Sequence, residues 1–215
     1  MQHSPPTLFV IGSSTTLLFG PHLKRMTEGL YRYSRKGDDP REMSKAFRDL
    51  DAGQGASAGD SSMVRKYLQA LDRAGSFHAD VVLMHVGGHD IRNDPATGNN
   101  QVPLEEFRRN VEAIVEWFSR RGIRLVWLLA GPIDETLHNA RSRSFHRFEK
   151  DLEEYNKAAE SVLKRAAVEI LDLPGFTRRL GPMAKLLKDH VHFTDDVVRL
   201  QAAFIAGYLM GAASR

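Results

Sequence analysis

The chain has no cysteine, which excludes disulfide bonds and thiolate chemistry. It also has no apolar run near the roughly 18 uninterrupted residues that a membrane-spanning helix needs. Its first residues, MQHSPPTLFVIGSS, lack the basic segment and the long apolar stretch of a signal peptide, so a cytoplasmic location is expected. No repeat, linker or low-complexity tract divides the 215 residues, and this length suits one domain, 1–215.

The chain also has no large excess of positive or negative charge, because its formal net charge is only +3. Basic residues alternate with acidic ones in helical stretches such as FRRNVEAIVEW (107–117). This pattern is typical of solvated helix surfaces and not of a phosphate-binding stripe, so nucleic acid is not an expected partner. Hydrophobic residues make up 42% of the chain, enough for a full core. No feature of the sequence indicates an oligomeric state.

Short apolar runs rich in β-branched residues predict the strands. These runs are almost continuously apolar instead of alternating, as expected for strands covered on both faces. A weaker fifth strand is predicted at residues 46–52. The clear runs are 8–11, 80–86, 123–130 and 168–173.

Helical patterns lie between the predicted strands. Residues 61–74 place their apolar side chains on one face, and residues 103–121 begin with proline and acidic residues. Residues 145–167 predict a long amphipathic helix, and Thr194 is the expected N-cap of the last one. The alternation predicts an α/β three-layer sandwich, with a parallel sheet of about five strands between two helix layers. Functional groups are then expected beyond the carboxyl ends of the strands.

Polar residues follow the predicted strands at the expected places. GSSTT (12–16) puts hydroxyl groups on a strand-to-helix turn, where they either supply a nucleophile such as Ser14 or only cap the helix. AGQGASAGDSS (52–62) offers backbone amides to an anion or oxyanion, or is a turn capped by Asp60 or Ser61. GGHD (87–90) adds His89 at the end of the second clear strand.

The stretch DHVHFTDD (189–196) precedes the last helix and suits a catalytic base. Asp189 and His192 are three positions apart, so the carboxylate can hold the Nδ1–H group while Nε2 accepts a proton. A serine nucleophile needs such a base, because its hydroxyl is unreactive at neutral pH. His190 is expected to face solvent.

Taken together, the stretches FVIGSSTT, AGDSS, GGHD and DHVH resemble, in order, the blocks of the SGNH hydrolase superfamily, the GDSL-like esterases. The resemblance implies a flavodoxin-like fold and ester hydrolysis through an acyl-enzyme, without a metal or other cofactor. It implies Ser14 as nucleophile, His192 as base and Asp189 as its partner. The oxyanion hole would combine the amides of Ser14 and Gly59 with the His89 side chain. The implied partner is a small-molecule acyl ester, with acetyl esters, such as those of sugars, as first candidates.

The chain departs from the family pattern at two positions. Ser13 replaces the usual aspartate before the nucleophile, with little effect expected because that residue does not attack. His89 replaces the asparagine that donates to the oxyanion, and a neutral imidazole still offers one N–H group. Gly55 is an alternative to Gly59 as the oxyanion glycine. Residues 20–48, rich in basic and aromatic side chains, are either a cover over the pocket or a surface loop.

Other functions stay open at the level of the sequence. The same fold could serve a lysophospholipase or a thioesterase, or a non-catalytic module that binds an anionic ligand. A metal-dependent hydrolase is a further alternative, although no spacing matches a strong zinc pattern. Its candidate ligands are His85, His89, Asp90, Asp189, His190 and His192.

Overall fold

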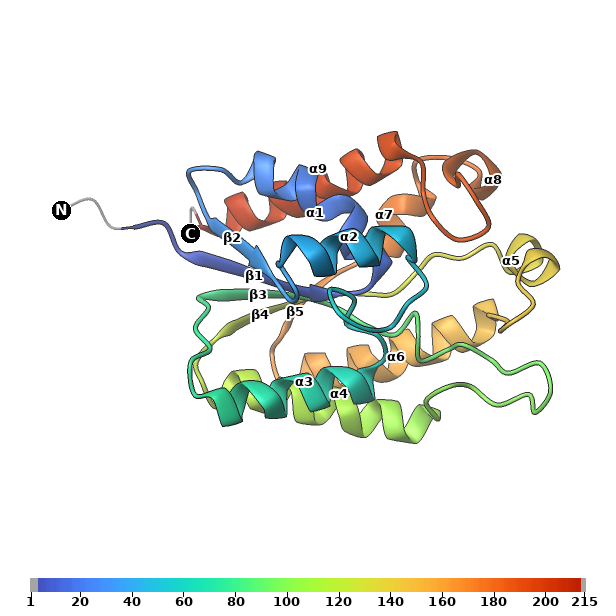
Figure 1. Cartoon of the computed structure of the whole chain (residues 1–215), viewed down its shortest axis with the longest axis horizontal. Coiled ribbons are helices and arrows are strands. Elements are labelled where there is room, and N and C mark those ends of the chain that lie inside the picture. Colours follow the sequence, from blue (N-terminus) through green and yellow to red (C-terminus); the bar gives the residue numbers. More distant parts are fainter. Residues whose placement is uncertain (1–3, 214–215) are drawn as a thin grey trace.

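The computed structural model describes residues 4–213 and contains a parallel sheet of five strands in the order β2-β1-β3-β4-β5. All four strand pairs are parallel, so the predicted α/β sandwich is confirmed (Figure 1). The strands are β1 Thr7–Gly12, β2 Arg32–Arg35, β3 Val81–His85, β4 Arg124–Leu128 and β5 Glu169–Leu171.

Helices form a layer on each face of the sheet (Figure 1). One layer contains α3 (Ser61–Ala74), α4 (Leu104–Ser119) and α6 (Glu149–Arg165), and the other contains α1 (Ser14–Met26), α7 (Leu173–Arg178) and α9 (Asp195–Ala213). None of the helices within residues 4–213 is long and apolar enough to cross a membrane. The remaining short helices are α2 (Pro40–Arg48), α5 (Glu135–Arg141) and α8 (Met183–Leu186).

The central strands are apolar throughout because both of their faces are buried. In β3, Val82 and Met84 pack against the layer of α3, α4 and α6. Val81 and Leu83 point the opposite way, toward α1 and α9. Successive side chains of a strand alternate between faces, so a strand between two helix layers needs apolar residues at every position.

The register of the sheet brings the strand ends to one edge. Gly12 at the end of β1 pairs with His85 at the end of β3, and His85 pairs with Leu128 at the end of β4. The chain passes from β1 to β2 on one side and continues to β3 on the other, so the strand order reverses beside β1. In open α/β sheets this switch point is where ligands bind.

The predicted fifth strand at residues 46–52 is wrong. These residues end α2 and then form a turn, in which the Asp49 side chain accepts the backbone N–H groups of Asp51 and Ala52, each at 3.1 Å. The strand that completes the five-stranded sheet is instead β2, with the sequence RYSR. It lies within residues 20–48, the segment expected to be either a cover over the pocket or a surface loop. An edge strand keeps polar side chains, so β2 has no apolar run that could reveal it.

The helix predicted from residue 145 begins only at Glu149. The preceding residues are extended, because Asn93 and His146 exchange two backbone hydrogen bonds of 2.9 and 2.8 Å. This long-range pairing overrides the local helical pattern. It also turns Arg147 toward the carboxyl edge of the sheet, where its side chain is 5% exposed.

Arg35 connects β2 to the segments that follow β1. Its side chain is 3% exposed, and its Nη1 and Nη2 atoms donate to the carbonyl oxygens of Thr16, at 3.2 Å, and Ala56, at 3.0 Å. Thr16 belongs to the first turn of α1, and Ala56 lies just before Gly59. The buried guanidinium therefore holds two strand-end segments together.

We predict that Arg35→Met lowers the free energy of unfolding by about 2 kcal/mol, because two buried carbonyl groups lose a charged donor. Urea denaturation of the purified protein measures the change. Arg41→Met, at an exposed position of α2, removes the same charge and is expected to stay within about 0.5 kcal/mol of the parent. Equal stability of the two variants would show that Arg35 does not link these segments.

Candidate active site

A pocket lies at the carboxyl edge of the sheet, at the switch point beside β1. Its cavity is small, about 50 Å³. Residues from five separate parts of the chain line it: Ser13, Ser14, Thr15, His85, Gly88, His89, Ile91, Gly131, Pro132, Ile133, Arg147, Leu152, Val191 and Phe193. The aligned ends of β1, β3 and β4 explain why these segments meet.

Ser14 is the first residue of α1 and lies directly beyond the strand-end Gly12. Its side chain is partly exposed in the pocket, whereas Ser13 beside it is buried. The first four N–H groups of a helix have no partner within the helix, and the helix dipole is positive there. Negative charge that develops near Ser14 is therefore stabilised.

Asp189 and His192 form a hydrogen-bonded pair within one loop. The distance between Asp189 Oδ2 and His192 Nδ1 is 2.9 Å, and Asp189 Oδ1 accepts the N–H groups of Val191, at 2.7 Å, and His192, at 2.6 Å. Burial opposes ionisation of Asp189, but these three hydrogen bonds outweigh it and lower its pKa. The carboxylate therefore stays charged and fixes the proton of the imidazole on Nδ1.

The Asp189–His192 loop is held at the pocket. Leu187 and Phe193 form a β-bridge that closes it, and α9, which follows, packs against α1 on the same face of the sheet. The neighbours of His192, Val191 and Phe193, line the pocket together with Ser14. His192 is 8% exposed, and its Nε2 atom is buried without a hydrogen-bond partner within residues 4–213, so it is not bonded to Ser14.

His190 does not face solvent, contrary to the prediction. It is partly buried, and its Nδ1 atom lies 3.0 Å from Nδ1 of His138 in α5. Burial is the main cause that lowers the pKa of His138 to about 4, so this ring is neutral at ordinary pH. The histidine pair connects α5 to the loop that carries Asp189 and His192.

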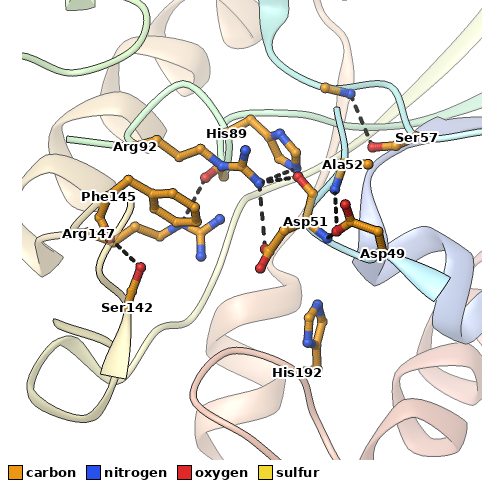
Figure 2. Close-up of polar contacts among 12 residues, drawn as sticks. Asp49, Asp51, Ala52, Ser57, His89, Arg92, Ser142, Phe145, Arg147 and His192 are labelled. Carbon is orange, nitrogen blue, oxygen red and sulfur yellow. Dashed lines mark hydrogen bonds and ion pairs between the residues drawn. The ribbon is translucent and has the colours of Figure 1, made fainter. Parts of the chain in front are cut away.

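His89 lies in the pocket and is 3% exposed. Arg92 Nη2 lies 3.3 Å from His89 Nε2, and because arginine only donates, Nε2 must be the acceptor (Figure 2). Burial, followed by the charges of Arg92 and Arg147, lowers the pKa of His89 well below its usual value. The ring is therefore neutral with its proton on Nδ1, and this buried atom has no partner within the described residues.

Of the two candidate oxyanion glycines, Gly59 is the one that shares a neighbour, Gly53, with His89. A Cβ atom built on Gly53 would be 3.6 Å from His89 Nδ1 and 3.5 Å from the Gly59 Cα atom, so the three residues border one space. Gly59 is buried and has a φ of +68°, a conformation that favours glycine. Gly55 is exposed and lies beside Glu42 instead.

Sequence reasoning missed the side chains that surround His89. Arg92 and Arg147 both lie against the ring of Phe145, with their guanidinium carbons 4.4 and 4.9 Å from its centre, and Asp51 lies 3.6 Å from Arg92 Nη2 (Figure 2). The local sequence pattern predicts a helix at Phe145 and Arg147 and a strand at Asp51. Their proximity depends on loop pairings over long sequence distances, for which the chain gives no local signal.

In the described part of the chain, the six candidate metal ligands do not form a cluster of three or more, although Asp189 and His192 pair with each other. Within residues 4–213 no group of three or more histidine, aspartate or glutamate side chains could hold a metal ion. Instead, His190 contacts His138, Asp189 is hydrogen-bonded to His192, and Asp90 accepts the Ser61 N–H group at 3.0 Å.

Sequence comparison places this chain in a known family. The model of the GDSL-like Lipase/Acylhydrolase family matches residues 10–200, which include both Ser14 and the Asp189–His192 loop. The chain belongs to this family. The implied SGNH hydrolase relationship is thus confirmed, and with it membership in a family of esterases and lipases. No curated protein matches the chain in sequence.

Solved structures of similar fold come from several bacteria. A GDSL-like lipase from Bacteroides thetaiotaomicron has a TM-score of 0.67 at 12% identity, with 98% of this chain and 92% of that chain covered. A lipase/acylhydrolase from Enterococcus faecalis has a TM-score of 0.62 at 16% identity, with 96% of each chain covered. A psychrotrophic esterase from Pseudoalteromonas sp. has a TM-score of 0.62 at 11% identity, with 98% and 100% covered. At these identities the likeness shows a shared fold.

Asp90, next to His89 in the segment after β3, has a fully buried carboxyl group that faces Ser61, the first residue of α3. Burial is the main cause that raises its pKa to about 7, although the hydrogen bond from Ser61 acts in the opposite direction. Its Oδ2 atom is buried without a partner within the described residues. In an unfolded chain an aspartate has a pKa near ~3.9. The protonated form is therefore favoured by folding, and this contribution to stability is lost as the pH rises toward 7.

Asp90→Asn keeps the Oδ1 acceptor and cannot ionise. We predict that its free energy of unfolding, relative to that of the parent, increases as the pH rises from 4 to 8. The expected gain in the free energy of unfolding is about 2 to 4 kcal/mol across that range. Urea denaturation at a series of pH values measures it. Asp196→Asn, on the exposed surface of α9, should show no such trend, and a flat profile for Asp90→Asn would contradict the assignment.

Proposed function

We propose that the chain, as one catalytic domain, is a serine esterase that hydrolyses small acyl esters through an acyl-enzyme. The single observation that carries this proposal is the shared pocket. It contains Ser14 at the amino end of α1 and is bordered by the loop in which Asp189 orients His192. Acyl transfer needs a hydroxyl group, an oriented imidazole and donors for negative charge, and here the pocket holds Ser14 and the helix amino end while the neighbours of the imidazole line its border.

In the proposed reaction, Ser14 Oγ attacks the ester carbonyl while His192 Nε2 takes its proton. Asp189 holds the Nδ1–H group and stabilises the imidazolium that forms. Collapse of the tetrahedral intermediate breaks the ester bond, and His192 returns its proton to the departing alcohol. Water then attacks the acyl-enzyme with His192 again as base, which releases the acid and restores the Ser14 hydroxyl.

The oxyanion hole is proposed to combine the amides of Ser14 and Gly59 with the His89 imidazole. Support comes from the proton on His89 Nδ1, which the Arg92 contact fixes, and from the position of this atom, which borders the same space beside Gly53 as Gly59 does. A neutral ring has only one N–H group, so a ring held in the opposite tautomer would have no donor to offer here. In this proposal Arg92 is a positioning residue that acts through His89.

The size of the pocket supports a short acyl group as substrate. A cavity of about 50 Å³ is small against the roughly 300–1,000 Å³ of typical pockets for larger ligands. An acetyl group suits it, and acetylated sugars are one class of such esters. The long acyl chain of a lysophospholipid would need space that this cavity does not provide.

A fluorophosphonate probe tests the nucleophile directly, because it forms a covalent bond with an activated serine. We predict that mass spectrometry finds the label on Ser14 and that His192→Ala abolishes it, since the base is lost. The solved esterase from Pseudoalteromonas is described as inhibited by monoethylphosphonate, a related reagent.

Activity on short-chain esters should be lost in the labelled protein and should survive treatment with a chelator. Loss of activity with the chelator, without labelling of Ser14, would support the metal-dependent alternative. A protein that is neither labelled nor active on any short-chain ester would be the non-catalytic binding module. Either result overturns the serine esterase proposal.

The role of His89 has its own test. We predict that His89→Ala lowers kcat by about 10²- to 10³-fold, the usual loss when one oxyanion donor is removed. His89→Asn, whose amide can donate, should retain part of the activity, and KM should change little in both variants. Wild-type turnover in His89→Ala would show that the imidazole does not bind the oxyanion.

A further inference from the structure

Arg147 is a buried cation in the wall of the pocket, and the proposed reaction does not use it. Its side chain lines the pocket together with Ser14 and His89 and is 5% exposed. Its Nε atom donates to the Gly88 carbonyl oxygen at 3.0 Å. Its Nη1 atom is buried and has no hydrogen-bond partner within residues 4–213.

The charges around Arg147 are not balanced by a carboxylate of its own. Asp51 is the acidic residue whose charge acts on it, but Asp51 already lies within ion-pair distance of Arg92, at 3.6 Å. In Figure 2 the ring of Phe145 lies between the Arg92 and Arg147 side chains, so two guanidinium groups share one ring and one carboxylate.

A buried charge without a partner is costly, so buried charges are normally paired with an opposite charge. Burial lowers the pKa of Arg147 to about 10, which still leaves the guanidinium charged at neutral pH. The hydrogen bond to Gly88 and the contact with Phe145 fix its orientation. The Nη1 donor is therefore held in place for an acceptor that the protein itself does not supply.

We infer that the substrate carries an anionic group, a carboxylate or a phosphate, close to its ester bond, and that Arg147 binds this group through Nη1. The inference rests on the proposed esterase function and narrows its substrate class. A guanidinium suits both groups because its planar set of donors matches their oxygen atoms. The alcohol part of the ester is the part that carries the charge, since the cavity leaves room only for a short acyl chain.

Three acetyl esters test the inference: O-acetylglycolate, its neutral amide, and 2-acetoxyethyl phosphate. The expected kcat/KM of the wild-type protein is about 10- to 100-fold higher for a charged ester than for the amide, as for a hydrogen bond to a charged group. The two charged esters distinguish a carboxylate from a phosphate. Equal kcat/KM for all three esters would overturn the inference.

The matched variants are Arg147→Met and Arg143→Met. Arg143 lies in the same loop but is exposed, so its variant loses the same charge without changing the pocket. In Arg147→Met the preference for the charged ester should fall to about onefold, and in Arg143→Met it should stay as in the wild type. If Arg147→Met does not fold by circular dichroism, Arg147→Gln, which can still donate to Gly88, takes its place. A preserved preference in the Arg147 variant would contradict the inference.

A binding measurement separates this inference from the esterase proposal. In Ser14→Ala the acyl transfer is blocked, so binding can be measured without turnover. O-acetylglycolate or 2-acetoxyethyl phosphate should raise its Tm more than the neutral amide does, and this difference should vanish in Ser14→Ala combined with Arg147→Met. Fluorophosphonate labelling of Ser14 without any anion preference would refute the role of Arg147 alone. Anion binding without labelling would refute the esterase alone.

Discussion

The parallel register of the sheet is the constraint on which the site depends. Gly12, His85 and Leu128 pair across three strands, so the chain leaves each strand at the same level. Ser14, His89 and the pocket segment that begins at Gly131 follow from this alignment, because each lies only a few residues beyond a strand end. A shift of one residue in one strand would turn its side chains to the opposite face and displace the segment that follows.

The second requirement is that a distant loop reaches this edge. Asp189 and His192 form their pair within one turn, so the geometry of the pair is local. Its position in the molecule is not local, because it depends on the packing of α9 against α1, the last helix against the first. The two helices bury Leu23 and Ile205 in the same apolar cluster, and the hydrophobic effect thereby holds the loop beside Ser14.

Burial gives the polar groups of the pocket their charge states. It lowers the pKa of His85 to about 4 and holds that of His89 well below its usual value, so both imidazoles are neutral. Arg147 stays charged under the same burial because its intrinsic pKa is far higher. The wall of the pocket therefore combines neutral imidazoles with a fixed positive charge, and the proposed preference for anionic groups rests on this combination.

The sequence by itself determined the fold class, four of the five strands and the pairing of Asp189 with His192. Each of these depends on residues close together in the chain: continuous apolar runs, helical periodicity and a three-residue spacing. Only the tertiary structure decided the edge strand β2, the extended residues before α6 and the cluster of Arg92, Phe145 and Arg147. These features depend on contacts between distant segments, such as Asn93 with His146, and such contacts override the local pattern without leaving a signal in it.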